Sequence, residues 1–312
     1  MTNIYFTNEL GILQEINEFK KGCWINLTEP THEEIEYVAK KFNIDSEIIT
    51  DALDEEEKSR IEKEDNLVLI LVDIPVFSED DAESSFYYTI PLGIIISNEY
   101  FMTVCLKPNA IINDFIQNKV KGFNTYMKTR FSLQLLYLIS KYYLRYLKQI
   151  NKKTNEIEDR IHKSLKNEEL YSLLSIEKSL VYFATSLKAN EIIMEKIMRV
   201  NYLKMYEEDK EIIEEVIIEN KQAIEMAHIY SSILSGMMDA FASVISNNLN
   251  VVMKFLTSVT ILLAIPTMIA SFYGMNVDLP FQNYQHAFTL TLMISITLSI
   301  ILAFVFARKK FF

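Results

Sequence analysis

Three residues near the end of the sequence, Gly274, Met275 and Asn276, follow a long hydrophobic segment and are followed closely by Asp278. The glycine alone would allow the backbone to turn at this point. The carboxamide of Asn276 and the carboxylate of Asp278 add oxygen atoms that attract cations, and no Lys or Arg lies between Val277 and His286. Closely spaced copies of the segment would bring their Asn276 side chains together in a ring. The motif is therefore a candidate for cation recognition.

A polar stripe leads along the preceding hydrophobic segment to this motif. Its members recur every three or four residues, as on one face of an α-helix: Ser246, Asn250, Met253, Thr257, Thr260, Ala264, Thr267 and Ser271. The other faces carry large apolar residues such as Phe255 and Leu262. Such a stripe fits either tight helix packing through small residues or the lining of a water-filled path. Because it ends at Asn276, we favour the water-filled path.

Two hydrophobic segments must position the motif. The first, Val251 to Phe272, has Lys254 as its only charged residue, and the second, Ala287 to Ala307, has none. Each has about 20 residues, the length of helix that crosses about 30 Å of hydrocarbon. Basic residues stay on the cytosolic side, so the cluster at 308–310 predicts two membrane spans with cytosolic termini and an outer loop over 277–286.

The N-terminal part of the sequence predicts a cytosolic α/β domain. "NLVLILVDIPVF" and "IPLGIIISNEYFMTVCL" are β-branched runs of strand length. Thr31 and Glu34 have the spacing of a helix N-terminus, and that helix should end near Asn43. A second helix should follow within "DSEIITDALDEEEKSRIEKEDN" and lead into a charged stretch.

Long helices are predicted for the middle of the chain, because no Pro and only Gly236 interrupt residues 123–250. The third of these helices should run unbroken from the cytosol into the first span. The predicted divisions are 1–122 for the α/β domain, 123–209 for a helical hairpin, 210–250 for a stalk helix, 251–273 for the first span, 274–286 for the motif and outer loop, 287–307 for the second span and 308–312 for a basic tail.

Five acids in the second predicted helix and the charged stretch after it form another candidate for cation binding. They are Asp51, Asp54, Glu55, Glu56 and Glu57. A run of charges is also typical of a solvated helix end, and we favour that interpretation.

Composition excludes several classes of function. The chain has 312 residues, 50% of them hydrophobic, with only 6 Gly and 6 Pro, which favours long helices over an all-β fold. The net charge of -11 argues against a nucleic acid as partner and agrees with a surface that gathers cations.

Cys23 and Cys105 lack metal-ligand spacing and should be buried thiols. The segment "MTNIYFTNEL" lacks the pattern of a signal peptide.

Catalytic and nucleotide-binding patterns do not stand out either. No Ser/His/Asp or Cys/His set suggests an enzyme, and no GxxxxGK[ST] loop suggests a bound nucleotide. The histidines are scattered at His32, His162, His228 and His286, which gives no dedicated transition-metal site.

The sequence resembles the CorA family of magnesium channels along its whole length. The resemblance is carried by "YGMN" after a proline-containing hydrophobic segment, followed by a short loop, a second hydrophobic segment and a basic end. "DALDEEEKSRIEKEDN" and "SNNLNVVMKFLTSVT" are similar to the family's N-terminal segment and its junction between stalk and pore. The resemblance implies a funnel-shaped homopentamer in the plasma (inner) membrane, whose partners are identical subunits and lipid.

In that family the first span lines the pore. The resemblance implies that Gly274, Met275 and Asn276 form the selectivity filter, with Asp278 as an external acid. Mg²⁺ releases its water reluctantly, so a ring of asparagine carbonyls suits the hydrated ion, whereas carboxylates would slow its release. The stripe supplies the expected pore-lining residues: Asn250, Met253, Thr257, Thr260, Ala264, Thr267 and Ser271.

Further roles are implied near the cytosolic mouth. Met253 and Leu256 correspond to a hydrophobic constriction that closes the pore by excluding water. A basic collar is implied by Lys254, Arg308, Lys309 and Lys310, for which ordinary anchoring at the membrane interface is the alternative.

Two positions depart from the family pattern. Ala264 stands where a bulky methionine often lies, and Pro266 is displaced by one residue from its usual place. Either the pore is wider at this depth or the neighbouring turn supplies the bulk.

The resemblance also implies regulation by cytosolic Mg²⁺ that bridges acids of neighbouring subunits. Glu215 falls where the family has a sensing aspartate, and Glu214 is adjacent. Asp80 and Asp81 are candidate partner acids, together with Glu79 and Glu83; a solvated hairpin tip is the alternative for this cluster. Apposed carboxylates repel until a divalent cation bridges them, so loss of the metal would open the pore.

The favoured function is therefore a channel that conducts hydrated Mg²⁺ into the cytosol down the membrane potential. Mg²⁺ would be both the transported and the regulatory ion, with Co²⁺ or Ni²⁺ as further cations. The first alternative is a transporter of the same fold for Zn²⁺, Co²⁺ or Ni²⁺. Met275 argues for magnesium, because zinc-transporting relatives (the ZntB group) usually vary this residue. The second alternative is a membrane-anchored scaffold without transport.

Overall fold

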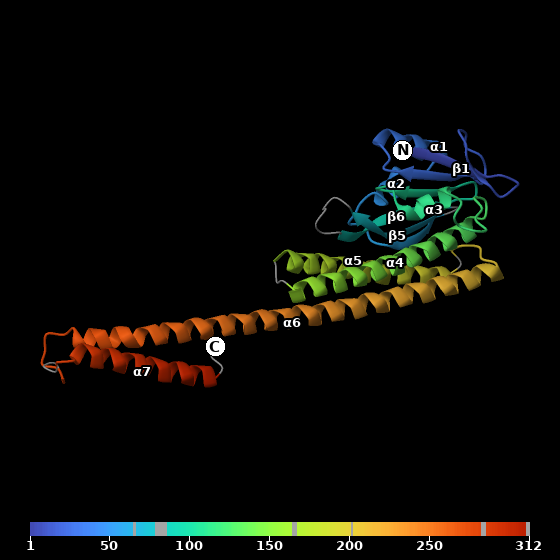
Figure 1. Ribbon diagram of the computed structural model, residues 1–312. Helices are drawn as coiled ribbons and strands as arrows, with labels where there is room; N and C mark the ends of the chain where they lie inside the picture. The colour runs from blue at the N-terminus through green and yellow to red at the C-terminus, as the bar shows by residue number, and fades with distance from the viewer. Residues whose placement is uncertain (65–66, 79–85, 164–166, 201, 282–284, 310–312) are drawn as a thin grey trace. The chain divides into compact units, whose positions relative to one another are not determined.

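The computed structural model describes residues 1–64, 67–78, 86–163, 167–200, 202–281 and 285–309 (Figure 1). The chain divides into two compact units, Met1–Leu234 and Ser235–Phe312. The long helix α6 (Glu207–Tyr273) belongs to both units.

The first unit is built on a seven-stranded sheet in the order β2-β1-β3-β7-β6-β5-β4. The strands are β1 (Thr2–Thr7), β2 (Leu13–Glu15), β3 (Trp24–Thr28), β4 (Arg60–Glu64), β5 (Leu67–Ser78), β6 (Phe86–Ile96) and β7 (Phe101–Cys105). β3 and β7 pair in parallel, and the other neighbours are antiparallel. The predicted run "IPLGIIISNEYFMTVCL" thus forms most of β6, a turn and β7.

Two helices, α1 (His32–Phe42) and α2 (Ser46–Asp51), cover one face of the sheet. The predicted N-terminus of α1 is confirmed, because Thr31 and Glu34 form a reciprocal capping box and the C-cap is Asn43. Ala52 at the end of α2 packs directly on Gly93 of β6. A Cβ at Gly93 would lie 2.5 Å from the Ala52 Cβ, so only glycine permits this close approach.

The helices α3 (Ala110–Ile116), α4 (Lys128–Lys163) and α5 (Asn167–Arg199) lie on the other face. An aromatic cluster joins the sheet to α4, with the rings of Phe101 and Phe131 stacked 4.0 Å apart. Asn190 of α5 fixes the helix to β5: it donates to the Asp73 carbonyl at 2.8 Å and accepts from the Asp73 N–H at 3.0 Å.

The second unit contains the C-terminal part of α6 and helix α7 (Ala287–Arg308). Both helices are long and apolar enough to cross a membrane. The predicted architecture, an α/β domain followed by long helices and two candidate membrane helices, is therefore confirmed. The helix that carries the stripe runs without interruption from Glu207 to Tyr273, although Pro266 lies inside it.

Candidate cation pathway and regulatory acids

One face of α6 packs toward α7 in the second unit, and Figure 1 shows α7 running back along the end of α6. From residue 251 to the end of α6, four at least partly buried residues recur at a helical spacing of four, three and four, and Val259 is also partly buried. The four are Ser258, Leu262, Ile265 and Ile269. On α7, Ser295 is also buried. Small side chains such as serine allow two helices to approach closely.

The predicted pore-lining residues lie on roughly the opposite side of α6, since they follow a different three- and four-residue series. Every one of them is exposed: Asn250, Met253, Thr257, Thr260, Ala264, Thr267 and Ser271. The chain's own α7 therefore does not cover the stripe. Tight packing against the chain's own α7 is therefore excluded as its explanation, and the stripe is open to another chain, to lipid or to water.

Hydroxyl groups along the stripe present acceptors outward. Thr260 donates its hydroxyl hydrogen to the Leu256 carbonyl at 2.8 Å, and Thr267 donates to the Leu263 carbonyl at 3.1 Å. Because each donor is used within the helix, the remaining lone pairs of the oxygen are available as acceptors. Acceptors of this kind suit the water molecules that surround a cation.

The Gly-Met-Asn motif begins directly where α6 ends. Gly274 still donates its N–H to the Ala270 carbonyl at 3.0 Å, and Met275 donates to the Phe272 carbonyl at 3.3 Å. We expected Gly274 to allow the turn through the backbone freedom of glycine, but its φ is not positive, so the turn does not require that freedom. A Cβ there would instead approach the Ala270 carbonyl oxygen to 3.3 Å, closer than most Cβ contacts.

The oxygen-bearing residues of the motif face outward. Asn276 and Asp278 are both exposed, and the Tyr273 hydroxyl donates to the Pro280 carbonyl at 3.4 Å across the turn. A single chain supplies only one Asn276 carboxamide, too few oxygens to surround an ion that takes six ligands. Several chains would have to contribute for the motif to hold a hydrated cation.

The predicted gate and collar residues are also at the surface of α6 and α7. Met253 and Leu256 are 52% and 57% exposed. Lys254 and Lys309 are exposed, and the Arg308 guanidinium lies 5.9 Å from the centre of the Phe304 ring. Lys310 lies outside the described residues.

The predicted regulatory acids lie on the part of α6 that belongs to the first unit. Glu214 is exposed, and Glu215 accepts a hydrogen bond from the Tyr137 hydroxyl of α4 at 3.2 Å. Asp80 and Asp81, with Glu79 and Glu83, lie outside the described residues. One turn beyond Glu215, Glu219 pairs with Lys141 of α4 at 2.7 Å.

Tyr137 and Lys141 are neighbours of the predicted regulatory acids that the sequence analysis missed. Both helices place these residues four positions apart, and each pair is separated by 78 residues along the chain. That matching spacing was visible in the sequence, but it becomes a contact only once α4 and α6 are known to lie beside each other in register.

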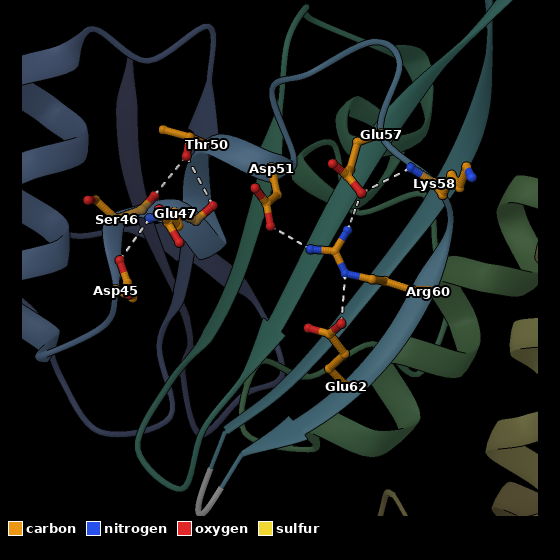
Figure 2. A network of polar contacts seen from close by, with 9 residues as sticks. All are labelled: Asp45, Ser46, Glu47, Thr50, Asp51, Glu57, Lys58, Arg60 and Glu62. Carbon is orange, nitrogen blue, oxygen red and sulfur yellow. Dashed lines mark hydrogen bonds and ion pairs between the residues drawn. The ribbon is translucent and has the colours of Figure 1, made fainter.

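Two of the five predicted acids, Asp51 at the end of α2 and Glu57, contact the guanidinium of Arg60, as does Glu62 (Figure 2). Arg60 of β4 contacts Asp51 at 2.5 Å and Glu62 at 3.0 Å, and it also pairs with Glu57. Burial alone would lower the pKa of Arg60, but the hydrogen bond to Asp51 and the nearby carboxylates raise it. An internal cation thus occupies the centre of this cluster. Among the residues that the structure describes, no group of three or more His, Cys, Asp or Glu side chains is placed to hold a metal ion.

Comparisons with known proteins agree with this geometry. Residues 19–309 match the family model of the CorA-like Mg²⁺ transporter protein. The cobalt/magnesium transport protein CorA of Methanocaldococcus jannaschii is 31% identical over 304 residues, which cover 95% of this chain and 94% of the relative. The corresponding protein of Thermotoga maritima is 20% identical over 97% of this chain and 87% of its own length.

Solved structures give the same result. The complete structure of the CorA magnesium transporter from M. jannaschii superposes with a TM-score of 0.85 at 27% sequence identity. The match covers 99% of this chain and 98% of that one.

Proposed function

Because the chain belongs to the CorA-like Mg²⁺ transporter family, whose members are membrane transporters and not enzymes, we propose that it forms a channel for hydrated Mg²⁺. Identical chains, five by the family pattern, would surround a central path with the α6 stripe facing inward. The exposed stripe that ends at Asn276 is the observation that supports this proposal most strongly.

The chemistry of the path suits an ion that keeps its water. Copies of Gly274, Met275 and Asn276 would form the filter, with Asp278 attracting cations outside it. Below the filter, the hydroxyl oxygens of Thr260 and Thr267 would accept hydrogen bonds from the hydration shell. Neutral acceptors bind the ion weakly enough for it to leave, which conduction requires.

Closure would occur at Met253 and Leu256, where rings of large apolar side chains exclude water. The remaining stripe positions, Asn250, Thr257, Ala264 and Ser271, would line the path. Lys254, Arg308, Lys309 and Lys310 would surround its cytosolic end. The inside-negative membrane potential supplies about 2.3 kcal/mol per elementary charge per 100 mV for inward movement of a cation.

Regulation would come from Mg²⁺ on the cytosolic side. We assign sensing to Glu215 and Glu214, with Asp80 and Asp81 as acids contributed by a neighbouring chain. Cobalt is a second candidate substrate, because the M. jannaschii relative is named a cobalt/magnesium transport protein.

Flux of Mg²⁺ into liposomes that contain the full-length protein tests the proposed filter. Asn276→Ala should reduce the initial rate at least about tenfold, equivalent to about 1.4 kcal/mol, because the ring of carbonyl acceptors is lost. Val277→Ala shortens the adjacent side chain in the same loop and should leave the rate within about twofold of the wild type.

Equal rates for Asn276→Ala and the wild type would remove the filter assignment. Absence of flux from the wild type at every internal Mg²⁺ concentration would favour a membrane-anchored scaffold instead. Mg²⁺ on the side of the cytosolic domain should suppress wild-type flux. This suppression should be weaker in Glu215→Gln.

A further inference from the structure

A line of polar contacts joins α4 to the part of α6 that lies within the first unit. At one end, Arg130 of α4 pairs with Glu208 at 2.5 Å and with the buried Asp209 at 3.3 Å. Further along both helices, Tyr137 contacts Glu215 and Lys141 contacts Glu219. Because contacts with the same separation of 78 residues recur along their length, the two helices run parallel and in register here.

The middle of this line holds two acids and one cation. Glu215 and Glu219 lie one helical turn apart on the same face of α6, where like charges repel. The Lys141 ammonium lies 2.7 Å from the Glu219 carboxylate and 5.2 Å from the centre of the Tyr137 ring. The Glu219 side chain is 16% exposed and the Lys141 side chain 41%, so water screens this ion pair only in part.

Lys141 remains charged in this position. The hydrogen bond to Glu219 raises the pKa of Lys141, against the opposing effect of burial. The ammonium therefore neutralises Glu219, which lies one helical turn from Glu215 on the same face of α6. A divalent cation approaching Glu215 meets this fixed charge, and Glu219 is already occupied.

We propose that Lys141 is a tethered cation that sets the sensitivity of the α6 acids to cytosolic Mg²⁺. It competes with the metal for Glu219 and repels it from Glu215, so inhibition requires a higher Mg²⁺ concentration than the acids alone would need. Tyr137 assists by holding the Glu215 carboxylate. Lys141 is thus a positioning and tuning residue, and the inference rests on the sensing role proposed for Glu215.

The test is the Mg²⁺ concentration on the domain side that halves flux through the full-length protein in liposomes. Lys141→Gln should lower this concentration about three- to tenfold, the effect expected of removing a unit charge a few ångströms from a divalent ion at physiological ionic strength. Lys141→Arg retains the charge and should restore the wild-type value. Lys152→Gln removes the same charge from the same helix, where Lys152 pairs with Glu156 at 3.8 Å, and should cause no shift.

The variants separate this inference from the proposed function. A raised half-inhibitory concentration in Glu215→Gln together with an unchanged one in Lys141→Gln would overturn the role of Lys141 and leave the sensor in place. An unchanged response of Glu215→Gln would overturn the sensor assignment and, with it, this inference. A shift of equal size in Lys152→Gln would show a general effect of net charge and would also contradict the proposal.

Discussion

Asp73 and Asp114 are two carboxylates of the first unit whose surroundings move their pKa values in opposite directions. Burial raises the pKa of Asp73, and the nearby Ser186 hydroxyl offsets only part of this effect. Burial acts in the same sense on Asp114, but hydrogen bonds from Tyr142 at 2.7 Å and Lys119 at 2.9 Å outweigh it and lower its pKa. The surroundings of Asp73 thus disfavour the ionised carboxylate, whereas those of Asp114 favour it.

Substitution of Asp73 should change how stability depends on pH. Because the pKa of Asp73 is higher in the folded protein than in the unfolded chain, its contribution to the free energy of unfolding falls as the pH rises above about 4. Asp73→Asn should therefore gain thermal stability relative to the wild type between pH 4 and pH 7, in melting curves of the purified protein.

Asp114→Asn provides the control of opposite sign. Because the pKa of Asp114 is lower in the folded protein than in the unfolded chain, its carboxylate stabilises the fold at pH values above its unfolded-state pKa. This stabilisation is lost as the pH falls through its folded-state pKa. Asp114→Asn should be less stable than the wild type at pH 7, with a smaller difference at acid pH. The same trend in both variants would contradict the assigned pKa directions.

The residues of the stripe could be predicted because positions three or four apart in the sequence lie on one face of a helix. The spacing of Thr260, Ala264 and Thr267 predicts a common face, and the structure leaves that face exposed. Which face α7 covers was not predictable, because small and hydroxylated residues such as Ser258 occur on both. The φ of Gly274 was likewise not predictable, because it depends on how the last turn of α6 closes and not on the residue type alone.

At the scale of elements, the N-terminus of α1 shows a local signal that fixes a boundary. The Thr31 hydroxyl accepts from the Glu34 N–H at 3.3 Å, and the Glu34 carboxylate accepts from the Thr31 N–H at 2.9 Å. Both partners lie within four residues of sequence, so no tertiary information was needed to predict them.

Removal of this cap should destabilise the first unit measurably. Thr31→Ala should lower the free energy of unfolding by about 1 kcal/mol, because the Glu34 N–H loses its hydroxyl acceptor. Thr31→Ser retains the hydroxyl and should lose only a few tenths of that amount. Urea unfolding monitored by circular dichroism measures the difference, and equal midpoints for all three proteins would exclude a stabilising role for the cap.

Other elements were beyond sequence reasoning for physical reasons. The stretch after α2 reads as a charged, solvated segment, yet residues Arg60–Glu64 form the edge strand β4 because β5 supplies its hydrogen bonds. The short strand β2 pairs only with its neighbour β1, and β1 in turn depends on its pairing with β3. Long helices such as α4 and α6 were predicted more readily, since their hydrogen bonds are internal.

At the scale of the whole molecule, one chain carries only part of the proposed pathway. Its second unit exposes the polar stripe, the apolar side chains of Met253 and Leu256, and a single Asn276. A polar stripe on a helix long and apolar enough to cross a membrane suits contact with another chain or with water better than contact with lipid. The family relationship and the exposed stripe together lead to the central claim that several copies of α6 surround an aqueous path.

Reaction of single cysteines with a cationic, water-soluble thiol reagent tests that claim most directly. Ala264→Cys lies on the stripe, whereas Leu263→Cys lies at the same depth outside it, where Leu263 is 68% exposed. The natural cysteines, Cys23 and Cys105, are buried and should contribute little background. With the full-length protein in liposomes, we predict that reagent added from outside modifies Ala264→Cys and blocks its Mg²⁺ flux, while Leu263→Cys keeps its flux. An unreactive Ala264→Cys beside a reactive, blocked Leu263→Cys would contradict the account.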